Sequence, residues 1–210
     1  MTLYRNQYRI ESTRLKGWDY TSNGYYFITI CTHQRICYFG QVARGQIILS
    51  TVGRLAYQFW AEIPAHFPFV SLDEFVIMPN HVHGILVLSG SRDVAMPRRD
   101  VALPRRDVAL QRLYPNNIGN DGKNEYMSHI SPKPGSVSTI VRSYKSIVSR
   151  TANREYPTIG FGWQARFYDH IIRSEAELQR IQTYIKNNPR RWVEDSLYIS
   201  DNTCDNVVET

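Results

Sequence analysis

The sequence predicts an α+β fold in which an antiparallel sheet carries helices on one face and a further helix follows at the C-terminal end. The chain has 210 residues, of which 42% are hydrophobic and 21% charged, and this is the composition of one globular domain. Strand-like and helix-like segments follow one another in the order β-α-β-β-α-β-α. Without a small hairpin and the last helix, this order is the split βαβ pattern of ferredoxin-like folds.

The first part of the chain contains a strand, a hairpin and a helix. A turn-forming stretch at 21–24 precedes 25–32, where aromatic and β-branched residues predict a buried strand. The apolar stretches 39–42 and 46–49 flank an Arg-Gly pair and predict a small hairpin. Apolar residues then recur at helical spacing, so we expect a helix over 51–63 that ends at a proline.

Two adjacent strands and a long insertion form the centre of the chain. The apolar runs 74–78 and 81–88 are separated by a Pro-Asn pair and predict neighbouring strands. Residues 92–112 then contain three copies of a heptapeptide that begins Arg-Asp-Val-Ala. Prolines in two of the copies prevent a continuous helix, and apolar residues are too few for a core. We therefore interpret 89–135 as a disordered or extended insertion without a chemical role.

The last part of the chain predicts two helices around one strand. An apolar stripe at helical spacing predicts a helix over 136–153, and 167–172 has the pattern of a strand. Ser174 and Glu177 form a capping box, which marks the start of a helix that ends before Pro189.

Charge is distributed unevenly along the chain. The formal net charge is +6, but no Lys or Arg follows Arg191, so residues 1–191 alone carry +11. A basic body favours an anionic partner such as nucleic acid. We expect residues 1–193 to form the domain and 194–210 to be an acidic tail that stays outside its binding groove.

The cysteines and the apolar runs indicate where the protein resides. The three cysteines form no CxxC pair and are odd in number, which predicts free thiols in a reducing compartment. No apolar run approaches the length of a membrane span, and the first residues lack the apolar core of a secretory signal. We expect a cytoplasmic protein without membrane association.

Two histidines in one predicted strand are the strongest candidates for a metal site. His81 and His83 are separated by one residue, so in a strand they share a face and can bind one cation together. The same spacing also arises by chance, with one histidine exposed and the other packed. The apolar neighbours favour the metal site, because a buried polar group needs a partner.

The last helix offers two further candidates. Tyr184 and Asn188 are four residues apart and therefore lie on one face of a helix. The tyrosine can serve as a nucleophile and the asparagine as a metal ligand. The alternative is a half-buried helix tyrosine and an ordinary C-terminal residue before Pro189.

Four segments carry a combined pattern that is more specific than the histidine pair alone. They are Met78-Pro79-Asn80-His81-Val82-His83-Gly84, the lead 14–20, the segment 163–173 and Tyr184-Ile185-Lys186-Asn187-Asn188-Pro189. Together they resemble the REP-associated tyrosine transposases, which are relatives of the HUH-class single-tyrosine transposases of small insertion sequences. The resemblance covers about residues 4–193, except for the insertion.

The resemblance implies a role for each of these residues. His81 and His83 would be ligands of a divalent metal, Mg or Mn in the family, and Asn188 would be the third ligand, where insertion-sequence members usually have Gln. Tyr184 would attack single-stranded DNA, so that the enzyme cuts and rejoins hairpin repeats of the REP type through a 5′-phosphotyrosine. Members of these families are monomers or homodimers.

Several basic residues and one histidine are candidates for contacts with DNA. Some lie on the predicted helix 136–153, and the others lie in or beside the segment 163–173. The alternative is that they form solvated charged faces or structural contacts. The candidates are Arg142, Lys145, Arg150, Arg166, His170 and Arg173.

Two other functions remain open at this point. One is a non-catalytic nucleic-acid-binding protein on the same fold. The other is a hydrolytic metalloenzyme that uses His81 and His83, against which we count the lack of an Asp or Glu beside the pair in the sequence.

Overall fold

The computed structural model describes residue 15, residues 17–90 and residues 133–199. The heptapeptide copies at 92–112, and most of the predicted insertion, therefore lie outside the described residues. In chain order the elements are β1 (Gly24–Cys31), η1 (His33–Arg35), β2 (Gly40–Ala43), β3 (Gln46–Leu49), α1 (Thr51–Ala61), α2 (Ile63–His66), β4 (Val70–Met78), β5 (His81–Leu88), α4 (Val137–Glu155), η3 (Pro157–Ile159), β6 (Tyr168–Ile172), α5 (Glu175–Asn187) and η4 (Pro189–Glu194).

A four-stranded antiparallel sheet in the order β4-β5-β1-β6 organises the molecule. Strands β1 and β5 lie in the middle, and β4 and β6 lie at the edges. If the four strands of this sheet are numbered in chain order as 1 (β1), 2 (β4), 3 (β5) and 4 (β6), their order across the sheet is 2-3-1-4. This is the arrangement of ferredoxin-like folds. The predicted fold class is therefore confirmed.

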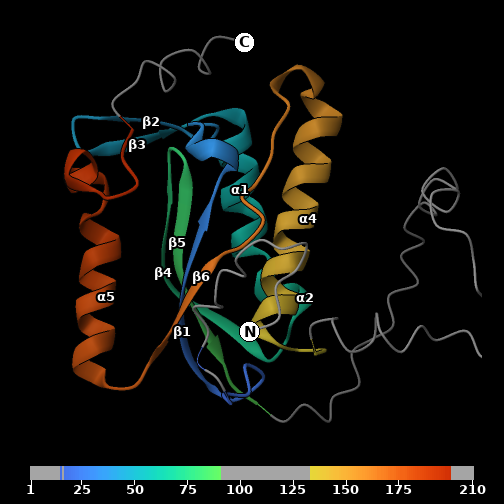
Figure 1. Cartoon of the computed structure of the whole chain (residues 1–210), viewed down its shortest axis with the longest axis vertical. Helices are drawn as coiled ribbons and strands as arrows, with labels where there is room; N and C mark the ends of the chain where they lie inside the picture. The colour runs from blue at the N-terminus through green and yellow to red at the C-terminus, as the bar shows by residue number, and fades with distance from the viewer. Residues whose placement is uncertain (1–14, 16, 91–132, 200–210) are drawn as a thin grey trace, which may run out of the picture.

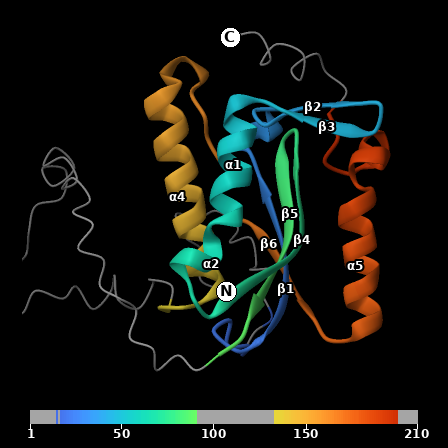
Figure 2. The same ribbon diagram turned by 180° about the vertical axis from the view of Figure 1, so that it is seen from behind.

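The two faces of the sheet have different covers. Figures 1 and 2 show α1, α2 and α4 together on one side of the sheet and α5 alone on the other. Because side chains alternate along a strand, Tyr26, Ile28 and Ile30 of β1 enter the larger core with α1 and α4. A smaller cluster on the opposite face consists of Ile85, Ile172, Leu178, Ile181 and Ile185.

A glycine in β5 allows the helical layer to approach the sheet closely. A Cβ atom at Gly84 would lie 2.4 Å from Cζ2 of Trp60 and 3.0 Å from Cβ of Phe75. The indole of Trp60 is fully buried and meets the Tyr144 ring edge-on, with centroids 5.1 Å apart. Tyr144 also donates a hydrogen bond to the Ala56 carbonyl at 3.1 Å, so this tyrosine faces the core.

Three elements differ in detail from the prediction. The helix expected over 51–63 is divided into α1 and α2, because Pro64 lies in the first turn of α2, where no backbone N–H is needed. Strand β4 begins at Val70, four residues before the predicted 74–78, and its register shifts between Leu72 and Phe75. This shift interrupts the alternation that a sequence pattern can detect.

The hairpin and the two predicted helix starts follow the sequence signals. In the β2–β3 turn, Arg44 and Gly45 have positive φ angles of 54° and 72°, as expected for a two-residue turn of type I′. Ser136 and Ser174 accept hydrogen bonds from backbone N–H groups of α4 and α5 as N-caps. The Glu177 carboxylate bonds back to the N–H of the residue before the cap, at 3.0 Å.

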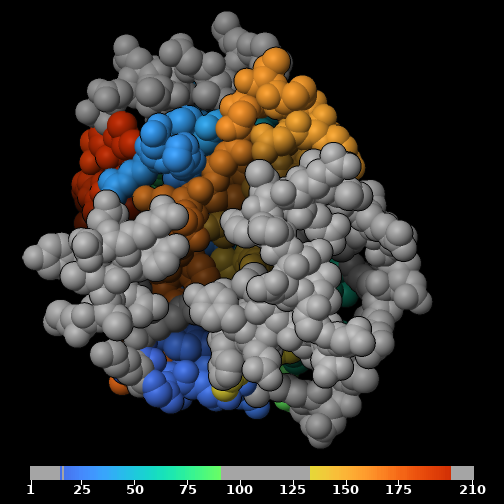
Figure 3. Space-filling view, turned by 45° about the vertical axis from the view of Figure 1, so that its right-hand side comes forward, coloured from blue at the N-terminus to red at the C-terminus, as the bar shows by residue number. Residues whose placement is uncertain are grey.

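The segment between α4 and β6 pairs with the residues that directly follow β1. Thr32 and Trp163 form an isolated antiparallel bridge, and the N–H of His33 donates to the Gly162 carbonyl at 2.8 Å. In Figure 3 these two segments lie side by side on the surface, light blue beside orange. Trp163 packs against the larger core, whereas the next residue, Gln164, lies among the residues around His83.

Two expectations from the sequence concern thiols and membranes. Cys31 is free, but Cys37 is fully buried and disulfide-bonded, so the prediction of free thiols is wrong at Cys37. Within the described ranges, no helix is both long enough and apolar enough to cross a membrane.

Candidate active site

The two histidines of β5 lie under the C-terminal part of the chain, on the face of the sheet that α5 covers. His81 is fully buried and His83 is 3% exposed. Their ring centroids are 4.4 Å apart. Opposite them on β1 are Cys31 and Thr29. The strand thus presents two imidazoles side by side in a dry environment.

A chain of hydrogen bonds determines which nitrogen of His81 carries the proton. The Leu197 carbonyl can only accept, so the Asn80 amide donates to it through Nδ2, at 2.9 Å. This orients Oδ1 of Asn80 towards Nδ1 of His81, at 2.8 Å, and Nδ1 must donate. The lone pair of His81 therefore lies on Nε2.

His83 is held by one partner on each ring nitrogen. Its Nδ1 lies 2.8 Å from Oγ1 of Thr29, and its Nε2 lies 3.1 Å from the hydroxyl of Tyr184. A proton on Nδ1, donated to Thr29, leaves the lone pair on Nε2, and this is the tautomer that metal binding through Nε2 requires. Both histidines can thus direct Nε2 towards the same space.

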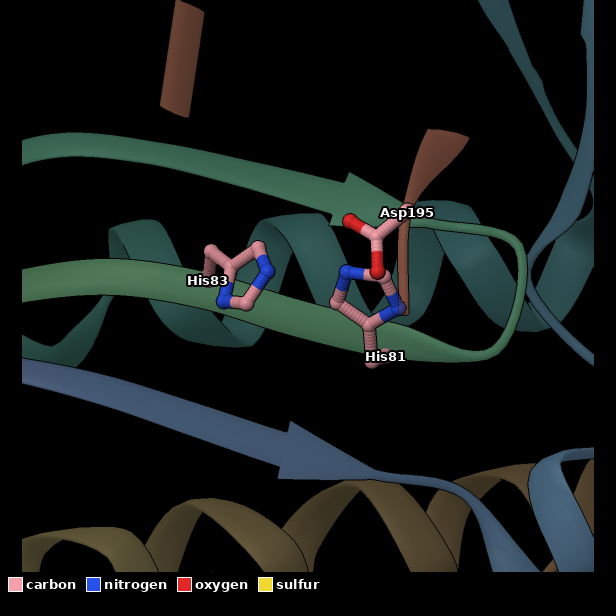
Figure 4. Close-up of side chains that lie close together, drawn as sticks. All are labelled: His81, His83 and Asp195. Carbon is pink, nitrogen blue, oxygen red and sulfur yellow. The ribbon is translucent and has the colours of Figure 1, made fainter. Parts of the chain in front are cut away.

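An aspartate from the segment after η4 completes the cluster. Figure 4 shows the carboxylate of Asp195 beside the two imidazoles, and the potential ligand atoms of the three residues lie within 4.8 Å of one another. The Asp195 carboxylate accepts hydrogen bonds from the Leu197 N–H and from Nδ2 of Asn188, each at 2.7 Å. These bonds leave its position well defined.

The position of Asp195 corrects, for the described residues 194–199, the expectation that the acidic tail stays outside the binding groove. After η4 the chain turns back over β5 instead of leaving the domain. The buried Trp192 ring packs 5.8 Å from His81 and 5.3 Å from Tyr198. Apolar packing on both sides of Asp195 therefore holds the carboxylate in the site, and the charge pattern alone does not reveal this.

Helix α5 brings Tyr184 and Asn188 to the same cluster. Its buried residues Leu178, Ile181 and Ile185 pack on the sheet. With the helix fixed in this way, Tyr184 contacts His83 and Asn188 contacts Asp195. Tyr184 is 44% exposed, but its hydroxyl points at His83 and lies 3.4 Å from Oδ2 of Asp195.

The protonation of the site follows from its burial. Burial lowers the pKa of His81 well below its usual value, with smaller contributions from His83 and Arg35. Burial also lowers the pKa of His83 to about 4, although Asp195 opposes this effect. Both imidazoles are neutral at pH 7, as metal ligands must be.

Burial, together with the charge and hydrogen bond of Asp195, raises the pKa of Tyr184 to about 12, and a hydrogen bond from Asn188 partly opposes the increase. The phenol is therefore protonated at neutral pH in this arrangement.

Two unpartnered polar atoms indicate that the cluster fits a cation. Among the described residues, Nε2 of His81 and Oδ1 of Asn188 are buried without a hydrogen-bond partner. A buried polar atom of this kind is costly unless something pairs with it. Each of these atoms offers a lone pair, so a bound cation would provide the partner that it lacks.

Two cavities open on either side of Tyr184. One has a volume of about 470 Å³ and lies between α5 and the residues around Asp195, with Arg180 and Arg191 in its lining. The other has a volume of about 390 Å³ and lies over β1 and β6, with His83 in its lining. Tyr184 contributes to both linings, so an extended ligand that spans the two cavities passes the phenol.

The six candidates for DNA contacts are spread over both faces of the sheet. Arg166 lines the cavity over β1 and β6. Lys145 of α4 hydrogen-bonds the Gln164 carbonyl and lies 6.0 Å from the centre of the Trp163 ring. Arg142 and Arg150 are exposed on α4, which is in the layer opposite the histidines.

The remaining two candidates belong to the junction of β6 and α5. His170 lies with its Nε2 2.9 Å from the Glu177 carboxylate, and Arg173 is exposed. The structure therefore brings only Arg166 of the six into the lining of a cavity beside Tyr184.

Three residues of the site were not expected from the sequence. Asp195 carries no local signal, because it lies in an acidic segment without periodicity. Asn80 belongs to the predicted turn and to the motif around the histidines, but the sequence assigns it no role of its own. Thr29 becomes significant only through the strand register, which places it opposite His83.

Comparisons with known proteins give a relative and two distant structural likenesses. No family model matches the chain. An uncharacterized protein of Haemophilus influenzae is 35% identical over 192 residues, which cover 90% of this chain and 92% of the relative.

The structure of a REP-associated tyrosine transposase bound to a REP hairpin is similar with a TM-score of 0.48 and 16% identity, over 91% of this chain and 74% of that one. A candidate transposase of Deinococcus radiodurans has a TM-score of 0.41 and 15% identity, over 84% of this chain and 97% of that one. Both likenesses are too distant to carry a function across. With 35% identity over nine-tenths of both chains, this chain belongs to the family of the Haemophilus influenzae protein.

Proposed function

We propose that the protein is a metal-dependent DNA strand transferase of the REP-associated tyrosine transposase type, with Tyr184 as its nucleophile. The observation that carries this proposal is the position of the Tyr184 hydroxyl, 3.1 Å from Nε2 of His83 and 3.4 Å from Asp195. A protonated phenol at the edge of a three-residue metal site is placed to attack a phosphate bound there.

The residues that would hold the metal are His81, His83 and Asp195. Asn188 was expected as third ligand, but its Nδ2 donates to Asp195, and its unpartnered Oδ1 makes it a fourth candidate. A mixed set of imidazole and oxygen ligands fits Mn²⁺ better than Mg²⁺, which prefers oxygen alone. When bound, the cation would polarise the scissile phosphate and offset the high pKa of Tyr184.

The covalent step uses the phenolic oxygen of Tyr184. This oxygen forms a bond to phosphorus, and the bond between phosphorus and the 3′ oxygen of the preceding nucleotide breaks. The phenolic proton is lost, and the departing oxygen takes up a proton to become a 3′-OH. The phosphate stays on Tyr184 as a 5′-phosphotyrosine, so attack by another 3′-OH rejoins the strand.

The proposed substrate is single-stranded DNA that carries hairpins of the REP type. The resemblance of the motifs supports this choice, and so does the +11 charge of residues 1–191. We place the reaction in the cytoplasm, with the protein acting as a monomer or a homodimer.

One observation favours a second function. Asp195 lies beside the histidine pair, which removes our argument against a hydrolytic metalloenzyme. Such an enzyme would cut DNA with water and would not need Tyr184. The position of the phenol favours strand transfer, and one assay separates the two.

The assay uses a pool of hairpin oligonucleotides with randomised single-stranded flanks and a label at the 3′ end. Because attack leaves the 5′ phosphate on Tyr184, the labelled fragment stays on the protein. We expect a labelled protein band that survives denaturation, requires Mn²⁺ and disappears when the metal is chelated.

Matched variants identify the nucleophile. Tyr184→Phe removes one oxygen and should abolish the band, whereas Tyr57→Phe, at an exposed ring on α1, should keep it. Cleavage without an adduct in both variants would instead support hydrolysis. Metal-independent binding without cleavage would support a non-catalytic DNA-binding protein.

A further inference from the structure

The cavity of about 390 Å³ beside Tyr184 is lined by aromatic rings and polar side chains. This volume is within the range of about 300–1,000 Å³ that is typical of small-molecule sites. Polar side chains of Thr29, Gln164 and Ser196 occur among the lining residues. The lining consists of Phe27, Thr29, Cys31, His83, Gln164, Arg166, Phe167, Tyr168, Tyr184, Ser196 and Leu197.

A continuous row of rings leads from this cavity to the phenol of Tyr184. The Tyr168 ring meets Phe27 edge-on, with centroids 6.4 Å apart. Phe27 stacks on His83 at 5.3 Å and meets Tyr184 edge-on at 6.2 Å. Because Tyr184 itself lines the cavity, a flat group that enters it comes close to the residue that we propose as the nucleophile.

Tyr168 is placed to stack with a ligand. It is 47% exposed, and it pairs with Thr29 across β1 and β6, so its ring stands on the same face as the histidines. Among the described residues β6 is an edge strand of the sheet. Tyr168 therefore contributes an exposed ring to the lining of the cavity.

We propose that this cavity binds one unpaired nucleobase of the DNA strand, stacked on Tyr168, next to the phosphate that Tyr184 attacks. The proposal deepens the proposed function and rests on it. Aromatic side chains are sequence-tolerant platforms for the bases of single strands, and the amide of Gln164 and the hydroxyl of Ser196 offer groups that can pair with a base edge. The basic body of the chain fits a polyanionic strand.

The experiment is photo-crosslinking of a dT12 oligonucleotide in which one thymidine at a time is replaced by 5-bromodeoxyuridine. The protein carries Tyr184→Phe, so no covalent adduct forms without light. Trypsin cuts after Arg166 and Arg173, which releases Phe167 and Tyr168 in the peptide 167–173. We expect the principal cross-link in this peptide.

Two further variants make the test quantitative. Tyr168→Ala should remove the cross-link and weaken binding of dT12 about five-fold or more, because stacking on one ring is lost. Tyr57→Ala changes a ring of similar exposure on α1 and should alter neither. Cross-links confined to other peptides, or none at all, overturn the base site.

The outcome does not depend on cleavage. A cross-link in 167–173 together with no phosphotyrosine in the wild type would keep the base site and refute the strand transferase. A phosphotyrosine in the wild type without this cross-link would support the strand transferase and refute the base site.

Discussion

Replacing Thr29 with valine removes the hydroxyl that supports His83 and keeps the shape of the side chain. Thr29 is buried, and its Oγ1 lies 2.8 Å from Nδ1 of His83. In the variant, Nδ1 either keeps its proton without a partner or transfers it to Nε2. A proton on Nε2 removes the lone pair that we assign to the metal, so both outcomes weaken metal binding.

The expected size of the effect follows from the burial of His83. An unsatisfied buried donor costs about 1–3 kcal/mol, so the metal-free variant should unfold at a lower temperature than the wild type. Loss of a residue that orients a metal ligand typically reduces affinity about 10- to 100-fold. The stabilisation by saturating metal should fall by about 1.4 kcal/mol for each ten-fold loss.

Calorimetric titration with Mn²⁺ measures the affinity for the metal. Thermal unfolding with and without Mn²⁺ measures how much metal binding stabilises the folded protein. Thr151→Val is a matched control, because Thr151 is a buried threonine of α4, outside the site. We expect the control to bind Mn²⁺ as the wild type does. If folded Thr29→Val also binds with wild-type affinity, His83 is not a ligand held by Thr29.

Three further predictions follow from the packing, the pKa values and the course of the chain. Gly84→Ala should destabilise the protein by about 1–3 kcal/mol in urea unfolding, because its Cβ would overlap Trp60; unchanged stability would refute this packing. Since burial lowers the pKa of His83 from 6.5 to about 4, the unfolded state binds a proton more readily, and metal-free protein should lose about 2 kcal/mol from His83 alone between pH 7.5 and pH 5. The lowered pKa of His81 adds to this loss in the same direction; a flat profile for the wild type would contradict the neutral buried histidines. Asp195→Ala should lose most of its stabilisation by Mn²⁺, whereas Glu194→Ala, at the neighbouring carboxylate that pairs with Arg191, should keep it; equal stabilisation of both would exclude Asp195.

Local patterns were sufficient to predict most of the fold. The strand around Tyr26, the capped helix after Ser174 and the turn at Gly45 each carry a local signal that the structure retains. The separate short helix α2, which contains Pro64, and the early start of β4 were not predicted. In both cases neighbouring elements stabilise a geometry for which the sequence pattern is weak or irregular.

The site was predictable only where its residues are close in sequence. The spacing of His81 and His83 places both rings on one face, and the spacing of Tyr184 and Asn188 does the same on α5. Asp195 reaches the cluster because of tertiary packing around Trp192, and a sequence contains no periodic signal for such a contact.

The identity of the residue that carries DNA after reaction with Mn²⁺ is the most direct test of Tyr184 as the nucleophile. The covalent product would be digested with nuclease and trypsin and analysed by mass spectrometry, which reads the peptide 181–186 that contains Tyr184. We expect a nucleotide attached through phosphate to Tyr184 in the wild type and none in Tyr184→Phe. A nucleotide on any other tyrosine, or an adduct of equal yield in Tyr184→Phe, would contradict this assignment.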